Sequence, residues 1–262
     1  MDIRTFIKIL NFYGRFTPSY TKIGYFARGL FLKRYAKDYT GQRWLITGAS
    51  GGIGRAMVIA AAESGAEVVA VARSQSKLQK LIDDLPTDVR SLVSYEVAEM
   101  SLQSDTERLR DRLIEGKPFN VLLNNVGVLF PELEISSEGR EATFVTNILS
   151  HFILTEGLVA NDKIVSGGAI INMTSGGMYN MPIGTRKLNV TDASKYNGKI
   201  AYAAHKRGQA VLTGYWNKKF KDRDIQTYVM HPGWTKTPGV KSALPVFYKV
   251  QNVVSLTRFQ RL

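Results

Sequence analysis

The chain has 262 residues, a length that suits one α/β domain with a large buried core. It contains no cysteine, which excludes disulfides and thiolate metal sites, and its three histidines lack metal-ligand spacing, so no metal site is predicted. The formal net charge of +13 is concentrated at the ends, because residues 1–43 hold nine Lys or Arg against two acids and residues 236–262 hold five against none. This basic fringe fits solubility, attraction to an anionic membrane surface, or a missing acidic partner segment.

Residues 1–42 form a basic arm that is rich in aromatic side chains. Within it Ile3, Phe6, Ile7 and Leu10 fall at helical spacing, which predicts an amphipathic helix lying on the domain or on a membrane. The chain has no run of about 18 apolar residues and no signal peptide, so we expect an intracellular protein, either cytoplasmic or peripheral on a membrane. It has no recognised nucleic-acid-binding module, and no nucleic-acid partner is expected.

From residue 43 onward, short β-branched runs alternate with stretches of helical spacing. Strands are predicted at Arg43–Thr47, Glu67–Ala72, Leu92–Val97, Asn120–Asn124, Ala169–Met173 and Ile225–Met230. Helices are predicted between them, at roughly 53–64, 75–85, 102–115, 138–160 and 200–220. Apolar strands that alternate with helices predict a Rossmann-type, doubly wound parallel sheet of about six strands, with helices on both faces. Residues 43–262 are therefore assigned to one catalytic domain, with its ligands beyond the carboxyl ends of the strands.

The first predicted strand runs into a glycine-rich turn that opens the first helix, with the spacing Gly-x-x-x-Gly-x-Gly. Because glycine has no Cβ, backbone N–H groups can approach a pyrophosphate, and the helix N-terminus adds partial positive charge. The turn is therefore predicted to bind a dinucleotide. Its predicted contacts are Gly48, Ser50, Gly51, Gly52, Ile53 and Gly54.

The second predicted strand ends at Arg73 and Ser74, where an NAD-binding protein usually has an acidic residue for the ribose 2′-hydroxyl. A cation and a hydroxyl at this position suit a 2′-phosphate, so NADP(H) is favoured over NAD(H). The alternative interpretation is that Arg73 is a solvated residue at the start of a loop.

Tyr202 and Lys206 lie four residues apart, on one face of the last predicted helix. A free tyrosine has a pKa of about 10, and a nearby ammonium group lowers it by stabilising the phenolate. Tyr202 can then act as general acid or base at a substrate hydroxyl.

The glycine-rich turn after the first strand and the Tyr-x-x-x-Lys pair on the last helix resemble the motifs of the short-chain dehydrogenase/reductase family. The resemblance covers about residues 43–240. It implies that Lys206 also holds the nicotinamide ribose, that Ser175 hydrogen-bonds the substrate oxygen, and that Asn147 anchors a water leading to the lysine. An ordinary helix asparagine is the alternative for Asn147, but a buried mid-helix amide is unfavourable in a helix, which favours the functional interpretation.

The resemblance also implies cofactor contacts after the third, fourth and sixth strands. Glu99 stands where the family usually has an aspartate that contacts the adenine. Asn125 and Gly127 belong to Asn-Asn-Val-Gly, which is close to the family's Asn-Asn-Ala-Gly. After the sixth strand, the implied contacts are Pro232, Gly233, Thr235 and Thr237.

Ser175 and Tyr202 are 27 positions apart, and the insertion from Met178 to Lys199 resembles that of retinol-dehydrogenase-like members, which take lipophilic alcohols and aldehydes. Two short sequences bring the resemblance closer to the dehydrogenase/reductase member 12 group. They are Thr174-Ser175-Gly176-Gly177-Met178 and His231-Pro232-Gly233-Trp234. Family members continue with another helix and a seventh strand, whereas this chain stops at Leu262. We therefore expect an exposed edge at the sixth strand, consistent with a fragment, a covering partner, or a loss of activity.

The expected function is that of an NADP(H)-dependent oxidoreductase. It would move a hydride between the cofactor and the carbon of a small lipophilic alcohol or its aldehyde or ketone. The alternative is an NADP(H)-binding sensor or scaffold without turnover. The oligomeric state stays open, with a homo-oligomer among the alternatives.

Overall fold

The computed structural model describes residues 7, 14, 21–31, 38–233 and 235. The contacts divide the chain into two units, one of residues 38–231 and one of the terminal stretches 1–37 and 232–262. The first unit holds the sheet and the helices that cover it. In the terminal unit, helix α2 (Lys22–Gly29) is described. The helix predicted for the first dozen residues lies, apart from Ile7, outside the described residues.

Six parallel strands of the described chain form one sheet in the order β3-β2-β1-β4-β5-β6. Their bounds are β1 Arg43–Thr47, β2 Glu67–Ala72, β3 Val93–Val97, β4 Phe119–Asn124, β5 Ile164–Met173 and β6 Gln226–Met230. In this order the chain reverses its direction of travel between β1 and β4, which opens a crevice at the carboxyl ends of these two strands. The predicted Rossmann-type fold is confirmed.

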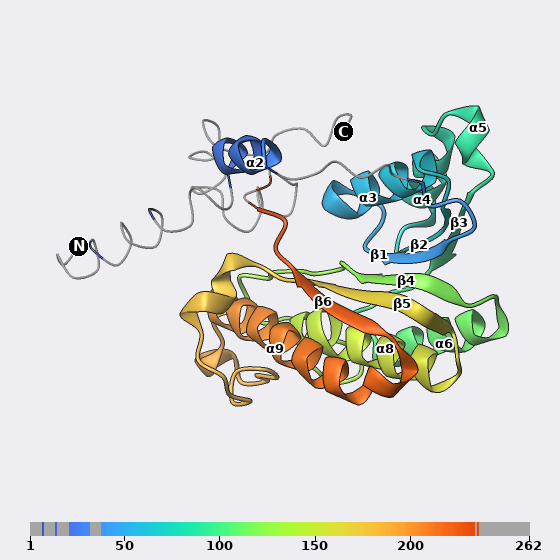
Figure 1. Ribbon diagram of the computed structural model, residues 1–262. Coiled ribbons are helices and arrows are strands. Elements are labelled where there is room, and N and C mark those ends of the chain that lie inside the picture. The colour runs from blue at the N-terminus through green and yellow to red at the C-terminus, as the bar shows by residue number, and fades with distance from the viewer. Residues whose placement is uncertain (1–6, 8–13, 15–20, 32–37, 234, 236–262) are drawn as a thin grey trace. The chain divides into compact units, whose positions relative to one another are not determined.

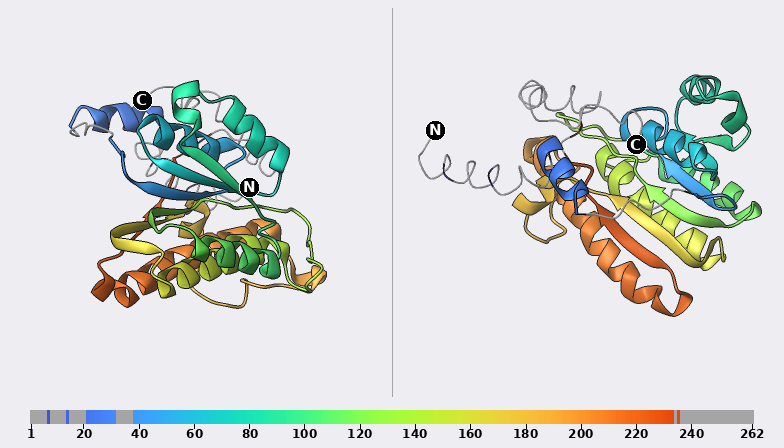
Figure 2. Two further views of the ribbon diagram at one scale, coloured as in Figure 1. Left: turned by 90° about the vertical axis from the view of Figure 1, so that its right-hand side faces the viewer. Right: turned by 45° about the horizontal axis from the view of Figure 1, so that its top comes forward.

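Helices cover both faces of the sheet (Figure 1), and the turned views show the same layers (Figure 2). One face carries α3 (Gly52–Glu63), α4 (Gln75–Asp83) and the short α5 (Thr87–Arg90). The other carries α6 (Gln103–Glu115), α8 (Ser150–Ala160) and α9 (Gly198–Lys219). Short elements complete the list: α7 (Ala142–Phe144), the π-helical turn η1 (Val145–Leu149), and the 3₁₀ turns η2 (Gly176–Asn180), η3 (Ala193–Lys195) and η4 (Lys221–Arg223).

Strands β1, β2, β4 and β5 are largely apolar because each contributes side chains to two separate cores, whereas β3 and β6, at the edges of the sheet, carry polar and exposed residues. In β1, Leu45 packs with Trp216 of α9 in one core, while its neighbour Ile46 packs with Val58 of α3 in the other. Successive side chains of a strand point to opposite faces, so a strand buried on both sides must be apolar at every position. The two cores hold the sheet rigid and fix the strand ends where the site lies.

Two elements begin four or five residues away from the predicted positions, whereas the other predicted elements begin within two residues of them. Strand β5 starts at Ile164 instead of Ala169, because its first half runs through Gly167 and Gly168, which weaken any strand pattern. The helix predicted for 138–160 begins at Ala142. Before it, Ile135 and Glu141 pair in an antiparallel bridge, which takes residues 138–141 out of the helix.

Residues Ala142–Ala160 are apolar and long enough to cross a membrane by length and composition alone. In the fold, 67% of this stretch is buried, and Leu154 and Leu158 of α8 belong to the core beside α6 and α9. Its burial is that of a core helix.

Trp216→Ala is expected to lower the free energy of unfolding by about 3–5 kcal/mol, because the indole is fully buried and its Nε1 donates to Glu156 Oε1 at 2.9 Å. Tyr215→Ala is the matched control, since Tyr215 is half exposed on the same helix and should cost about 1 kcal/mol or less. Urea denaturation measures both. Equal losses in the two variants would contradict this packing.

Candidate active site

The glycine-rich turn follows β1 at the carboxyl edge of the sheet and leads into α3. Gly48 and Gly52 have φ of +68° and +55°, the left-handed region that favours glycine. A Cβ on Gly54 would overlap the Gly48 carbonyl oxygen, whereas a Cβ on Gly51 would meet no heavy atom within 4 Å. The turn is therefore closely packed on one side and open on the other.

The N-terminus of α3 is well suited to a phosphate group. Its capping residue, Gly51, makes no side-chain cap, and the first turn of the helix carries no acidic side chain. The first N–H groups of a helix have no acceptor within the helix, and they carry partial positive charge. A pyrophosphate fits here because it needs donors, positive potential and the open space beside Gly51. The individual contacts predicted for Ser50 and Ile53 stay predictions.

The loop after β4 ties the glycine turn to the sheet. Asn125 Nδ2 donates to the Thr47 carbonyl at 2.8 Å, and Thr47 Oγ1 accepts from the Asn125 N–H at 3.0 Å and the Val126 N–H at 3.1 Å. The side chain of Asn125 is thus bound to the turn itself. Further along the loop, a Cβ on Gly127 would lie 3.3 Å from both Asn147 Oδ1 and Lys206 Nζ. Gly127 therefore lies against the predicted catalytic residues.

At the ends of β2 and β3, Arg73 and Glu99 form an ion pair, with 3.6 Å between Nη1 and Oε2. Glu99 Oε1 also accepts from the N–H of Ser101 at 3.1 Å and from its hydroxyl at 2.8 Å. Ser74 caps α4 by accepting from the Lys77 N–H at 3.4 Å. The predicted cofactor residues Arg73, Ser74 and Glu99 are thus brought to one corner of the carboxyl edge.

The predicted catalytic residues come together where α9 passes the end of β5. Tyr202 and Lys206 lie one helical turn apart on α9, and Lys206 Nζ is 5.4 Å from the centroid of the Tyr202 ring. Lys206 Nζ donates to the carbonyl of Met173, the last residue of β5, at 2.8 Å. Two residues further on, the Ser175 side chain lies close enough to the Tyr202 hydroxyl to influence its pKa. The structure therefore places the Ser175 and Tyr202 hydroxyls side by side.

Burial changes the proton affinity of both groups on α9. It raises the pKa of the Tyr202 hydroxyl, and the nearby Ser175 side chain opposes this rise. It lowers the pKa of Lys206 to about 7, because the ammonium form loses its hydration. Near neutral pH, Lys206 can therefore be charged or neutral in response to what binds beside it.

Asn147 lies in the π-helical turn η1, where extra width in the helix turns side chains away from regular packing. Its Oδ1 accepts from the Val128 N–H and its Nδ2 donates to the Val128 carbonyl, both at 2.9 Å. This pair of bonds holds the loop that carries Gly127. The buried asparagine is thus bound to the loop beside Lys206.

The sequence interpretation missed two residues that support Asn147. Gln209 Nε2 donates to the Asn147 carbonyl at 2.8 Å and contacts His151 Nδ1 at 2.9 Å, while His151 Nε2 lies 3.1 Å from the Val126 carbonyl. Burial lowers the pKa of His151 to about 3, so the ring is neutral. The signal was their helical spacing, since His151 is four residues after Asn147 and Gln209 is three after Lys206.

The cofactor contacts predicted after β6 belong to the terminal unit. Thr235 Oγ1 donates to the Pro232 carbonyl at 2.9 Å, which fixes a short turn that includes Gly233. Thr237 lies outside the described residues. The contacts of all four residues with a cofactor stay predictions.

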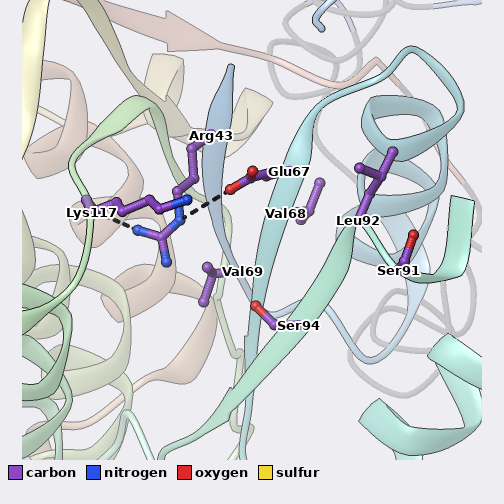
Figure 3. A pocket seen from close by; sticks show the side chains of 8 residues that line it. All are labelled: Arg43, Glu67, Val68, Val69, Ser91, Leu92, Ser94 and Lys117. Carbon is purple, nitrogen blue, oxygen red and sulfur yellow. Dashed lines mark hydrogen bonds and ion pairs between the residues drawn. The ribbon is translucent and has the colours of Figure 1, made fainter. Parts of the chain in front are cut away.

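A hollow of about 260 Å³ lies at the other edge of the sheet, among the first residues of β1 and β2 (Figure 3). The Arg43 guanidinium is already bound there: it donates to the Lys117 carbonyl, lies 4.4 Å from the Phe119 ring centroid, and pairs with Glu67 at 3.9 Å. Ligands of this fold bind at the carboxyl edge. The hollow is therefore not the candidate active site.

A family model for short chain dehydrogenases matches residues 42–187. The chain belongs to the short-chain dehydrogenase family of oxidoreductases. It is similar to dehydrogenase/reductase SDR family member 12 of Bos taurus, at 29% identity over 87% of this chain and 72% of the relative. It is also similar to retinol dehydrogenase 12 of Bos taurus, at 28% identity over 88% of this chain and 72% of the relative.

Solved structures with the same fold include a short chain dehydrogenase from Burkholderia cenocepacia J2315 in complex with NADP, with a TM-score of 0.61 and 23% identity over 76% of each chain. Another is the bulky-bulky ketone specific alcohol dehydrogenase from Comamonas testosteroni, with a TM-score of 0.60 and 22% identity over 74% of each chain. At these identities the likeness shows the fold that short-chain dehydrogenases share.

Gly54→Ala is expected to lower the free energy of unfolding by about 1–3 kcal/mol, because the new Cβ overlaps the Gly48 carbonyl oxygen and the turn must shift. Gly51→Ala is the control, since its Cβ meets open space and its backbone is extended. Chemical denaturation compares the two. A loss for Gly51→Ala as large as that for Gly54→Ala would show that the turn is not packed in this way.

Proposed function

We propose that this short-chain dehydrogenase is an NADP(H)-dependent oxidoreductase that interconverts a lipophilic alcohol and its aldehyde or ketone. The observation that carries the proposal is the grouping of Ser175, at the end of β5, with Tyr202 and Lys206 of α9, whose Nζ lies 5.4 Å from the Tyr202 ring centroid. The group stands at the carboxyl edge of the sheet, the edge that also carries the glycine-rich turn. A hydroxyl pair backed by a lysine is suited to hold and protonate one substrate oxygen.

Each residue has a role that follows from its chemistry. The Ser175 hydroxyl donates a hydrogen bond to the substrate carbonyl oxygen and fixes its position. Tyr202 gives a proton to that oxygen in reduction and takes it back in oxidation. When bound, NADP(H) supplies or accepts the hydride. Asn147 and Lys206 hold the loop and the phenol in place for these steps.

Lys206 sets the proton affinity of Tyr202. Burial alone brings the pKa of Lys206 to about 7, and the negative charge of a bound dinucleotide favours its ammonium form. The ammonium form stabilises the Tyr202 phenolate, which lowers the cost of proton transfer near neutral pH. The free protein is therefore a weaker acid–base catalyst than the protein with its cofactor.

The preference for NADP(H) rests on Arg73. Its side chain is 71% exposed at the end of β2, where it can turn toward a 2′-phosphate. The short chain dehydrogenase from Burkholderia cenocepacia was solved in complex with NADP.

The lipophilic substrate class rests on the insertion and on a relative. The insertion between Ser175 and Tyr202 exposes two large apolar side chains, Tyr179 and Ile183. Exposed apolar groups near a reaction site favour substrates that bury apolar surface. A relative that the chain resembles is named retinol dehydrogenase 12, and retinol is a lipophilic alcohol.

Tyr202→Phe is expected to reduce the turnover of NADPH with all-trans-retinal by roughly 10²–10⁴-fold, because the ring is kept and only the transferable proton is lost. NADPH binding, followed by protein fluorescence, should change little. The control is Tyr215→Phe, an exposed position on the same helix. Equal turnover in Tyr202→Phe and wild type would remove Tyr202 from the reaction.

Arg73→Glu is expected to weaken NADPH binding by at least about tenfold and to leave NADH binding within about twofold, because only NADPH carries the 2′-phosphate. Fluorescence titration of both cofactors measures this. Arg108→Glu on α6 is the control for a change of net charge. Equal weakening of both cofactors would contradict the NADP(H) preference. Tight NADPH binding without turnover on any carbonyl probe would favour the sensor or scaffold alternative.

A further inference from the structure

Two buried titratable side chains, Glu141 and His205, have no part in the proposed reaction. Both side chains are fully enclosed, and Glu141 Oε1 lies 3.9 Å from His205 Nε2. Within the described part of the chain, Glu141 Oε1 and His205 Nδ1 have no hydrogen-bond partner. Burying a carboxyl group and an imidazole costs free energy, and incomplete pairing adds to that cost. A pair that costs folding free energy in this way is a candidate for a functional role.

The remaining side-chain polar atoms of this pair, and the Glu141 N–H, bind three consecutive residues of the insertion. Glu141 Oε2 accepts from the Val190 N–H at 2.8 Å, and the Glu141 N–H donates to Asn189 Oδ1 at 3.3 Å. His205 Nε2 donates to the Leu188 carbonyl at 2.6 Å. Two elements far apart in sequence thus hold the same short stretch, residues 188–190.

Both anchors are built into the catalytic elements. His205 lies on α9 between Tyr202 and Lys206, directly before the lysine. Glu141 is the capping residue of α7, which continues into the turn that carries Asn147. A shift of residues 188–190 would therefore move Glu141 and His205, and with them the helices that position the proposed catalytic groups.

The insertion is also held at its far end. The Tyr196 hydroxyl donates to the Phe130 carbonyl at 3.2 Å and lies 3.3 Å from Thr143 Oγ1. A Cβ on Gly198 would overlap the same Phe130 carbonyl, so the chain passes close to it there. Between these anchors and Ser175, residues 182–187 are exposed. Residues 191–195 are exposed as well, so residues 188–190 are held between two exposed stretches of the insertion.

We propose that Glu141 and His205 are positioning residues that clamp residues 188–190 and thereby determine which substrates reach Ser175 and Tyr202. The inference rests on the proposed function for its substrate arm, since the insertion joins the two residues that hold the substrate oxygen. The clamp itself is a property of the fold and can be tested without turnover.

The protonation states suit a clamp made of neutral hydrogen bonds. Burial lowers the pKa of His205 to about 4, so the ring is neutral and Nε2 carries the proton that it donates to Leu188. Burial raises the pKa of Glu141 to about 7, and the bond from the Val190 N–H opposes the rise. Either form of the carboxyl can accept from that N–H. The clamp therefore needs hydrogen-bond acceptors and donors more than an ion pair.

Trypsin cleavage reports the clamp directly, because Arg186, Lys187 and Lys195 are exposed on the insertion. His205→Leu removes the donor to Leu188 and should speed cleavage of the native protein by about tenfold, the equivalent of one lost buried hydrogen bond. His205→Gln keeps an N–H near the position of Nε2 and should restore most of the protection. Equal cleavage rates in wild type and His205→Leu would overturn the clamp.

The carboxyl arm is tested in the same way. Glu141→Leu should also speed cleavage by about tenfold, while Glu141→Gln keeps an acceptor for the Val190 N–H and should stay close to wild type. Glu134→Gln, an exposed position just before the bridge, is the control. Should a leucine variant not fold, Asn189→Ala removes one bond from the surface and should still speed cleavage two- to threefold; no change there would overturn the proposal.

The specificity arm compares a bulky and a small probe, all-trans-retinal and propanal, with NADPH. In His205→Leu, the ratio of kcat/KM for retinal to that for propanal should fall at least fivefold, mainly through the KM for retinal, with His205→Gln near wild type. An unchanged ratio in a variant that trypsin cleaves faster would overturn the role in specificity. Absence of turnover in wild type would instead count against the proposed function, and the cleavage rates would still decide whether the clamp exists.

Discussion

The site depends on one hydrogen bond, which the buried Nζ of Lys206 donates to the carbonyl of Met173 at 2.8 Å. A buried N–H donor needs an acceptor whether the lysine is charged or neutral, and a carbonyl at the end of a central strand provides a rigid one. The bond fixes α9 against the end of β5, and Thr174 Oγ1 strengthens the junction by donating to the Lys206 carbonyl at 3.0 Å. Because Ser175 is the next residue and Tyr202 lies one turn up α9, the position of both hydroxyls follows from this junction.

The features that could be predicted from the sequence are those that depend on the spacing of nearby residues. Strands β1 and β2 begin and end where the apolar runs do, because residues buried on both faces leave an unbroken pattern. Tyr202 and Lys206 share a helix face by their spacing alone, and Ser175 reaches the carboxyl edge because it follows a strand. The grouping of these three residues at one edge of the sheet could therefore be predicted from the sequence.

What escaped prediction depends on partners far apart in the chain. His151 and Gln209 meet across 58 positions, and Glu141 meets Val190 across 49. Helical spacing places His151 on the face of Asn147 and Gln209 on the face of Lys206, but spacing alone does not say which distant partner a polar residue meets. Strand β5 started earlier than predicted for a similar reason, since Ile164 pairs with the distant Phe119 of β4, before the irregular stretch that holds its two glycines.

The Arg73–Glu99 pair shows how the proposed cofactor preference would be limited. The ion pair is exposed, so it contributes little in water and a 2′-phosphate can displace the carboxylate from Arg73. The Glu99 carboxylate would stay in place after losing Arg73, because Ser101 donates two hydrogen bonds to its other oxygen, Oε1. A fixed carboxylate would then stand near the incoming phosphate and repel it, while it could still accept a hydrogen bond from a ribose hydroxyl. Under the proposed function, Arg73 raises the affinity for NADP(H), and Glu99 limits the difference in affinity between NADP(H) and NAD(H).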